Sequence, residues 1–97
     1  MQRDEVIDRL REHEAELKKL GVLRLFLFGS TARDYANENS DVDLFFDYQK
    51  GSLGLLALME LKERAAAILG QPTDIMTHDS IHPIFRARIE QSAVLVF

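Results

Sequence analysis

Two aspartates separated by one residue stand where an apolar run begins. Asp41 precedes, and Asp43 lies within, the segment "VDLFFDY" at 42–48. Side chains alternate along a strand, so both carboxylates would point to the same side, with Cα atoms about 6.6 Å apart. Carboxylate oxygens are ligands that Mg²⁺ prefers, and paired divalent ions serve phosphoryl and nucleotidyl transfer. The pair indicates a two-metal site, although aspartates that only cap a loop in solvent would show the same spacing.

Gly29 and Ser30 follow another apolar run and suit the same site. The 12 residues between Phe28 and Asp41 are enough to return the chain antiparallel, so that the end of one strand lies beside the start of the next. Glycine lets the backbone approach a phosphate closely, and the N–H groups of a short helix beginning near Ser30 would attract its negative charge. Gly29 and Ser30 are therefore expected to face the aspartates.

A third carboxylate, Asp74, is expected at the same edge. It stands near the start of the strand-like segment "TDIMT" at 73–77. The chain between Asp43 and Asp74 contains a long helical segment, which is enough for a crossover to a parallel neighbouring strand. Three carboxylates and a Gly-Ser corner would thus converge.

The elements that position these residues follow from the spacing of apolar side chains. Apolar residues at helical spacing before Gly21 predict an amphipathic helix, and short apolar segments that end at turns predict strands. In chain order we expect a helix at 3–20, a strand at 22–28, a short helix from Ser30, a strand at 42–48, a helix at 53–69, a turn at 70–72, a strand at 73–77, a helix capped by Ser80 and entered through Pro83, and a strand at 93–97. This order predicts an α/β fold with a small mixed β-sheet flanked by helices.

Composition sets the limits on class. The 97 residues, 46% of them hydrophobic, are enough for one compact core, so we expect a single domain over 1–97. The net charge of −4 argues against broad nucleic-acid binding. Cysteine is absent, which excludes disulfides and thiolate metal sites. No apolar stretch approaches the roughly 18 residues of a membrane helix, and the first ten residues lack a secretory core, which favours a cytoplasmic protein.

The motif as a whole resembles a known family. Gly29-Ser30, Arg33 and Ser40-Asp41-Val42-Asp43-Leu44 are similar to the G-S-x-A-R-G-x-x-x-x-x-S-D-x-D-[LI] pattern of minimal nucleotidyltransferases in the DNA polymerase beta-like superfamily. The segment "TDIM" looks like the family's third-aspartate strand, and the resemblance covers nearly the whole chain. It implies the polymerase beta-like nucleotidyltransferase fold.

The resemblance also implies a partner and a reaction. Small stand-alone members of this kind typically occur beside a HEPN-domain protein and form a toxin–antitoxin pair with it. This chain would be the antitoxin (MNT), and it would transfer AMP from ATP to a tyrosine of the HEPN ribonuclease toxin. The added AMP would silence the toxin. A hetero-oligomer with the toxin is expected.

The resemblance assigns roles to the motif residues. Asp41 and Asp43 would hold two Mg²⁺ ions, while Asp74 would bind the metal on the attacking side and help to deprotonate the acceptor hydroxyl. Gly29 and Ser30 would hold the β- and γ-phosphates of ATP.

Three further residues of the motif region each have two interpretations. Arg33 is expected to contact a phosphate or to form an ion pair with a nearby carboxylate. Ser40 would orient the turn before Asp41 or bind the nucleotide directly. Asp34 departs from the family, which usually has glycine there, and its negative charge would weaken nucleotide binding unless it points away or caps the short helix.

Other polar residues have simpler interpretations. His13 is expected to be solvated on a charged helix face, and Asp47 to be a surface residue at the end of a strand. His78 and His82 flank Asp79, where a metal site or an exposed, capping role is conceivable. Arg86 and Arg88 would lie on a solvated helix face or meet an acidic or RNA partner; both are in the last predicted helix.

The helix at 53–69 is apolar on nearly all sides of its first half. Leu55, Leu58 and Met59 belong either to the core or to a surface that binds a partner.

Three classes of function stay open at this point. The first is the catalytic antitoxin. The second is a binding module that neutralises its toxin by stoichiometric contact, and the third is a nucleotidyltransferase that acts on a small molecule, although relatives of that type generally carry an additional helical domain.

Overall fold

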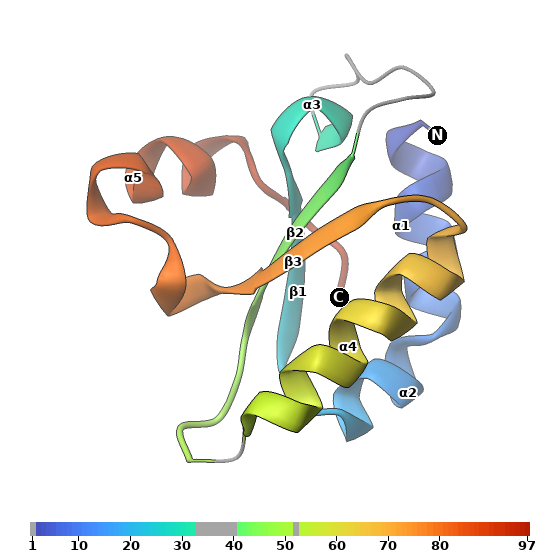
Figure 1. Cartoon of the computed structure of the whole chain (residues 1–97). Coiled ribbons are helices and arrows are strands. Elements are labelled where there is room, and N and C mark those ends of the chain that lie inside the picture. Colours follow the sequence, from blue (N-terminus) through green and yellow to red (C-terminus); the bar gives the residue numbers. More distant parts are fainter. Residues whose placement is uncertain (1, 33–40, 52) are drawn as a thin grey trace.

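The computed structural model describes residues 2–32, 41–51 and 53–97 and has the expected α/β order. Figure 1 shows the arrangement of the elements. Their bounds are α1 Arg3–Glu12, α2 Glu14–Lys19, β1 Arg24–Phe28, α3 Gly29–Ala32, β2 Val42–Asp47, α4 Leu55–Leu69, β3 Thr73–Thr77, the 3₁₀ helix η1 His78–Ser80, α5 Pro83–Ser92 and β4 Val94–Leu95.

The four strands form one mixed sheet in the order β3-β2-β1-β4. β2 pairs antiparallel with β1 and parallel with β3, as the lengths of the two connections predict. β4 pairs antiparallel with β1, and Val96 N–H donates to the Leu25 carbonyl at 2.8 Å just beyond it. The expected small mixed sheet is therefore confirmed.

Helices cover both faces of the sheet, which explains why β2 is apolar at successive positions. α1, α2 and α4 lie on one face, and α5 lies on the other (Figure 1). Leu44 and Phe46 belong to the larger core cluster beneath α1 and α4, whereas Phe45 points to the other face and packs with Phe28 and Ile81. A strand buried on both faces holds its register firmly, because a slip would expose large apolar side chains.

The helix predicted at 3–20 is in fact two helices, and the prediction of one helix is wrong at His13. Its backbone, at φ −109° and ψ 19°, leaves the helical region, and its N–H donates to the Leu10 carbonyl at 3.1 Å. His13 is also only partly exposed, and its Nδ1 lies 2.9 Å from Glu16 Oε2. The histidine thus marks the junction rather than a solvated helix face.

The predicted start of the last helix also needs correction. Pro83 is its first residue, as expected, but the cap is His82, whose Nδ1 accepts from the Ile84 N–H at 3.2 Å. Ser80 instead lies in η1, where its hydroxyl donates to the Thr77 carbonyl at 2.7 Å. Ser80 therefore belongs to the 3₁₀ helix that precedes α5 and does not cap α5.

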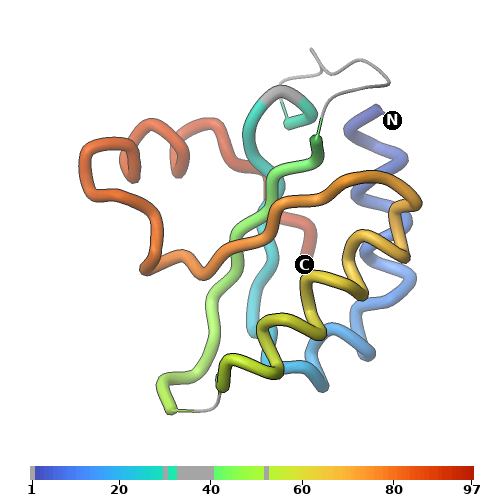
Figure 2. The backbone as a smooth tube through the Cα atoms, viewed as in Figure 1, coloured from blue at the N-terminus to red at the C-terminus, as the bar shows by residue number. Residues whose placement is uncertain are grey.

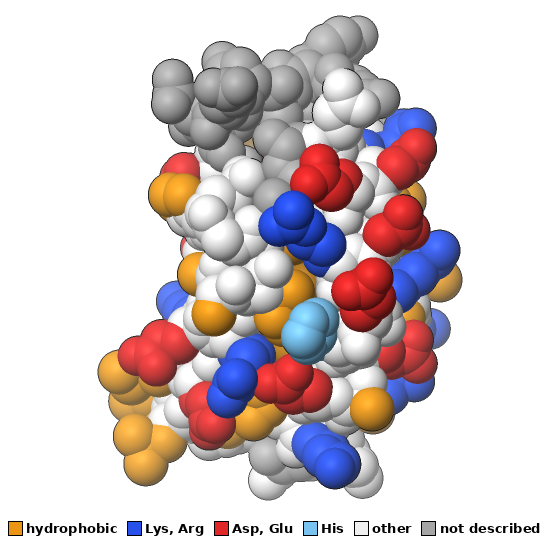
Figure 3. Space-filling model, turned by 90° about the vertical axis from the view of Figure 1, so that its right-hand side faces the viewer, with side chains coloured by type: hydrophobic (Ala, Val, Ile, Leu, Met, Phe, Trp, Pro, Cys, Tyr) orange, Lys and Arg blue, Asp and Glu red, His pale blue; other side chains and the backbone are white. Residues whose placement is uncertain are grey.

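The apolar residues of α4 divide into a buried set and an exposed set. Leu61, Ala65 and Leu69 are buried in the core. Leu55, Leu56 and Met59 are exposed by 74%, 81% and 52%, and we call these three the α4 apolar patch. Leu58, which was grouped with them, packs partly against the core. Hydrophobic side chains gather at the lower left of Figure 3, at the end of the molecule where α4 begins.

No helix within the described part of the chain has the length and apolar character needed to cross a bilayer.

The two faces of α4 predict opposite effects of substitution. Leu61→Ala should lower the free energy of unfolding by about 2–5 kcal/mol, since Leu61 is 0% exposed and truncation leaves a cavity. Leu56→Glu, at a position 81% exposed, should change it by no more than about 0.5 kcal/mol. Urea denaturation of both variants measures the difference. A large loss with Leu56→Glu would place that side chain in the core.

Candidate active site

Gly29, Asp43 and Asp74 meet at one edge of the sheet. The register of β1 against β2 places Phe28 opposite Asp43, and the parallel register of β2 against β3 places Asp43 opposite Asp74. The chain continues from Phe28 directly into Gly29 and α3, at the upper end of the molecule in Figure 2. The end of β1 and the starts of β2 and β3 therefore share this edge.

Gly29 is in close contact with the Asp43 carboxylate. A Cβ atom at position 29 would lie 2.5 Å from Asp43 Oδ2, closer than real Cβ contacts occur. The backbone there also has φ +78°, a left-handed conformation that favours glycine. Glycine at this position is thus required by the carboxylate as well as by the turn from β1 into α3.

The three carboxylates differ in their exposure. Asp43 is half-buried within β2, Asp74 is exposed within β3, and Asp41 is exposed just before β2 begins. Burial raises the pKa of Asp43, and the negative charges of Asp74 and Asp41 raise it further. Asp43 therefore carries its negative charge at a cost that a bound cation would relieve.

The fit of this edge to Mg²⁺ depends on its donors. Among residues 2–32, 41–51 and 53–97, no three His, Asp or Glu side chains are grouped closely enough to hold a metal ion. The three-carboxylate convergence expected from the sequence is thus a shared edge rather than a preformed cluster. The donor set still fits a hard cation, because carboxylate oxygens are its preferred ligands and Gly29 leaves the Asp43 carboxylate unobstructed.

The remaining motif residues are placed only in part. Gly29 and Ser30 form the first turn of α3, which packs against β1 and β2. Arg33, Asp34 and Ser40 lie outside the described residues.

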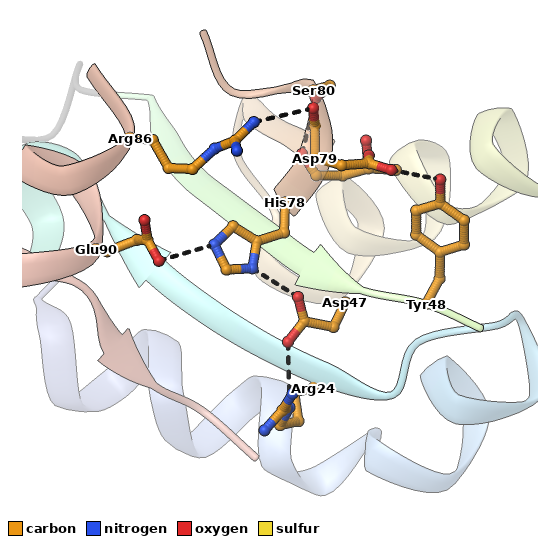
Figure 4. A network of polar contacts seen from close by, with 9 residues as sticks. Arg24, Asp47, Tyr48, His78, Asp79, Ser80, Arg86 and Glu90 are labelled. Carbon is orange, nitrogen blue, oxygen red and sulfur yellow. Dashed lines mark hydrogen bonds and ion pairs between the residues drawn. The ribbon is translucent and has the colours of Figure 1, made fainter. Parts of the chain in front are cut away.

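A polar network at the opposite end of the sheet was not expected (Figure 4). Asp47 is 20% exposed and lies 2.6 Å from His78 Nδ1 and 3.1 Å from Arg24 Nε. His78 Nε2 lies 3.3 Å from Glu90 on α5. Asp47 does end β2 and is partly exposed, as expected, but its ion pairs were not foreseen. Through His78, Asp47 connects the end of β2 to α5.

The parallel register could have revealed this network. Phe46 pairs with Thr77, so the next two residues, Asp47 and His78, also lie side by side. The exposed, capping role foreseen for the histidines holds for His82 but not for His78.

The last helix places its two arginines differently. Arg86 is partly buried, and its guanidinium donates to the carbonyls of Asp79 and Ile81. Arg88 is exposed, as a solvated helix face predicts.

A mixed sheet with a strand-to-glycine turn beside in-register aspartates defines the nucleotidyltransferase class. Residues 10–96 match the nucleotidyltransferase domain family, and the chain belongs to this family. The expected fold and enzyme class are thereby confirmed.

Relatives and solved structures agree with this assignment. A Methanocaldococcus jannaschii protein provisionally named a protein adenylyltransferase is 41% identical over 80% of this chain and 83% of its own. The protein adenylyltransferase MntA of Thermococcus cleftensis is 35% identical over 80% and 79% of the two chains.

Two solved structures share the fold. One provisionally assigned as a minimal nucleotidyltransferase superposes with a TM-score of 0.84 at 29% identity, covering 97% of this chain and 95% of the other. A complex of a tri-AMPylated Shewanella oneidensis HEPN toxin with its MNT antitoxin gives a TM-score of 0.60 at 18% identity, over 90% and 71% of the chains, and shows similarity of fold alone.

Gly29→Ala should impair the site beyond its effect on stability. The new Cβ displaces the Asp43 carboxylate, and a displacement of about 1 Å at a catalytic group can cost about 10²-fold in rate. Gly70→Ala is the matched control, since Gly70 has φ +68° but nothing within 4 Å of its Cβ position. Nucleotidyl transfer and thermal melting are measured for both. Equal transfer by the two variants at equal stability would show that the contact with Asp43 is unimportant.

The raised pKa of Asp43 predicts a pH-dependent stability. The folded chain binds this proton more tightly than the unfolded chain, so charging Asp43 destabilises the fold as the pH rises above the ordinary carboxyl value of about 3.9. Asp43→Asn should therefore raise the melting temperature at pH 7 in the presence of a chelator. The gain should vanish below about pH 3.9, where the native carboxyl is also neutral. Asp8→Asn on exposed α1 serves as the control, and a gain independent of pH would contradict the charge argument.

Proposed function

We propose that this chain transfers AMP from ATP to a tyrosine hydroxyl of a HEPN-domain ribonuclease toxin, and that it acts as the antitoxin of that pair. Membership of the nucleotidyltransferase family supports the reaction, and the names of its relatives support a protein as the acceptor. The observation that carries the proposal is the position of Asp43, held between the Gly29 backbone and the in-register Asp74.

Asp41, Asp43 and Asp74 would together hold two Mg²⁺ ions. When bound, these ions would offset the charge that develops on the α-phosphate and on the departing pyrophosphate. The raised pKa of Asp43 supports this role, since its burial and its two acidic neighbours favour a bound cation.

The chain's own residues would orient the reactants. Gly29 and Ser30 would receive the β- and γ-phosphates where β1 turns into α3, with Arg33 as a charge-assisted donor. Ser40 would orient Asp41. Asp74 is exposed on the neighbouring strand, where its carboxylate would accept the proton of the attacking tyrosine hydroxyl.

A second candidate is neutralisation by stoichiometric binding, in which Asp41, Asp43 and Asp74, here called the acidic edge, take no part in catalysis. The α4 apolar patch favours it, because three large apolar side chains are exposed together at the start of one helix. In this case the toxin would be silenced by contact alone.

Asp74→Asn should separate nucleotide binding from transfer. It retains Asp41 and Asp43, so ATP affinity in the presence of Mg²⁺ should stay within a few-fold of the wild type. Transfer of AMP to the toxin should fall by about 10²–10⁴-fold, the usual effect of losing a positioned general base. Calorimetry with ATP and a labelled-AMP assay measure both on one preparation, with Asp8→Asn as the control.

The possible outcomes distinguish the candidates. Undiminished transfer by Asp74→Asn would remove Asp74 from the catalytic residues. Lost transfer with full neutralisation of the toxin would favour stoichiometric binding.

A further inference from the structure

Tyr48 and Asp79 form a phenol–carboxylate pair at the end of the sheet remote from the candidate active site. The Tyr48 hydroxyl donates to Asp79 Oδ2 at 2.8 Å, and the bond is exposed (Figure 4). Both residues line a cavity of about 190 Å³, together with Lys50 and His78. The catalytic residues proposed above use none of these groups.

The geometry of the pair places a proton acceptor directly against the phenol, because Asp79 Oδ2 lies 2.8 Å from the Tyr48 hydroxyl. Hydrogen bonds from Thr77 and Tyr48 lower the pKa of Asp79, so it is a carboxylate at neutral pH and can accept a proton. The hydrogen bond to Asp79 raises the pKa of Tyr48, so the phenol is protonated at neutral pH and has to give its proton to Asp79 as it attacks. Lys50 is exposed and close enough to lower the pKa of Asp79, and its charge would attract a phosphate to the same place.

Tyr48 cannot reach the active site of its own chain. Five residues of extended strand separate it from Asp43, which corresponds to about 16 Å. β2 is an interior strand that pairs on both sides, so it cannot fold back on itself. The connection from β2 to α4 projects at the lower end of the molecule, whereas α3 lies at the upper end (Figure 1). An active site of this kind could therefore meet Tyr48 only on a different molecule.

We propose that Tyr48 is an acceptor for AMP delivered by a second copy of this chain. The inference rests on the adenylyl transfer proposed above. The phenolic oxygen of Tyr48 attacks the α-phosphorus of ATP held by the other copy, and an O–P bond forms. The bond from the α-phosphorus to the bridging oxygen breaks, pyrophosphate leaves, and the phenolic proton passes to Asp79.

Adenylylation would change the local structure. It removes the hydroxyl that donates to Asp79 and adds a negative phosphodiester beside that carboxylate. The hydrogen bond that joins Tyr48, just after β2, to Asp79 in η1 would thereby be lost. A modified chain would then differ from an unmodified one in the contact between these two segments.

The test pairs two variants that each lack one part of the reaction. Tyr48→Phe supplies an intact active site without the acceptor, and Asp43→Asn supplies the acceptor without the site. The two are distinguished by an added mass tag, mixed with ATP and Mg²⁺, and analysed by intact-mass and peptide mass spectrometry. AMP should appear on Tyr48 of the Asp43→Asn chain, and neither variant alone should be modified there.

Two controls test which tyrosine is modified and whether the transfer is between two molecules. The chain has two tyrosines, Tyr35 and Tyr48, and Tyr35→Phe should retain the modification because it leaves Tyr48 in place. The initial rate per wild-type molecule should rise in proportion to protein concentration, and a constant rate would overturn transfer between copies. AMP on a HEPN-domain toxin without AMP on Tyr48 overturns this inference alone, whereas absence of both also removes the proposed function.

Discussion

The close approach of the Gly29 backbone to the Asp43 carboxylate is the constraint around which this fold is arranged. Position 29 has no room for a Cβ atom, and its positive φ turns the chain from β1 into α3 at that point. The contact requires the β1–β2 register that sets Phe28 opposite Asp43. Burial of β2 on both faces secures this register, because Phe45 and Phe46 fill separate clusters on the two sides of the sheet.

The carboxylates at the two ends of β2 have opposite electrostatic surroundings. Asp47 is satisfied by His78 and Arg24, which is how a structural carboxylate is stabilised. Burial raises the pKa of Asp43, and the charges of Asp74 on β3 and of Asp41 just before β2 raise it further. A bound cation would offset this unfavourable charge, which agrees with the metal-binding role proposed for Asp43. The end with Asp47 holds the structure together, and the end with Asp43 is suited to chemistry.

The sequence predicted the elements better than the side-chain contacts that join them. Strands and the long helix follow from apolar spacing, and connection length gave the direction of each strand pair. The break at His13 could not be foreseen, because the apolar spacing continues through it into α2. The cap at His82 was missed because serine is the commoner capping residue. The Asp47–His78 pair needed the register itself, which periodicity alone does not supply.

The candidate active site and the α4 apolar patch lie apart along the molecule, so the proposed catalysis and the proposed contact with a partner would use different residues. The acidic edge lies by α3, whereas the α4 apolar patch and Tyr48 lie towards the other end of the molecule (Figure 1). An interior strand with large side chains buried on both faces keeps its register, because a slip would expose those side chains. A substitution at one end should then leave the other end intact. Loss of chemistry and loss of binding are therefore separable in single variants, and each candidate function can be tested without disturbing the other.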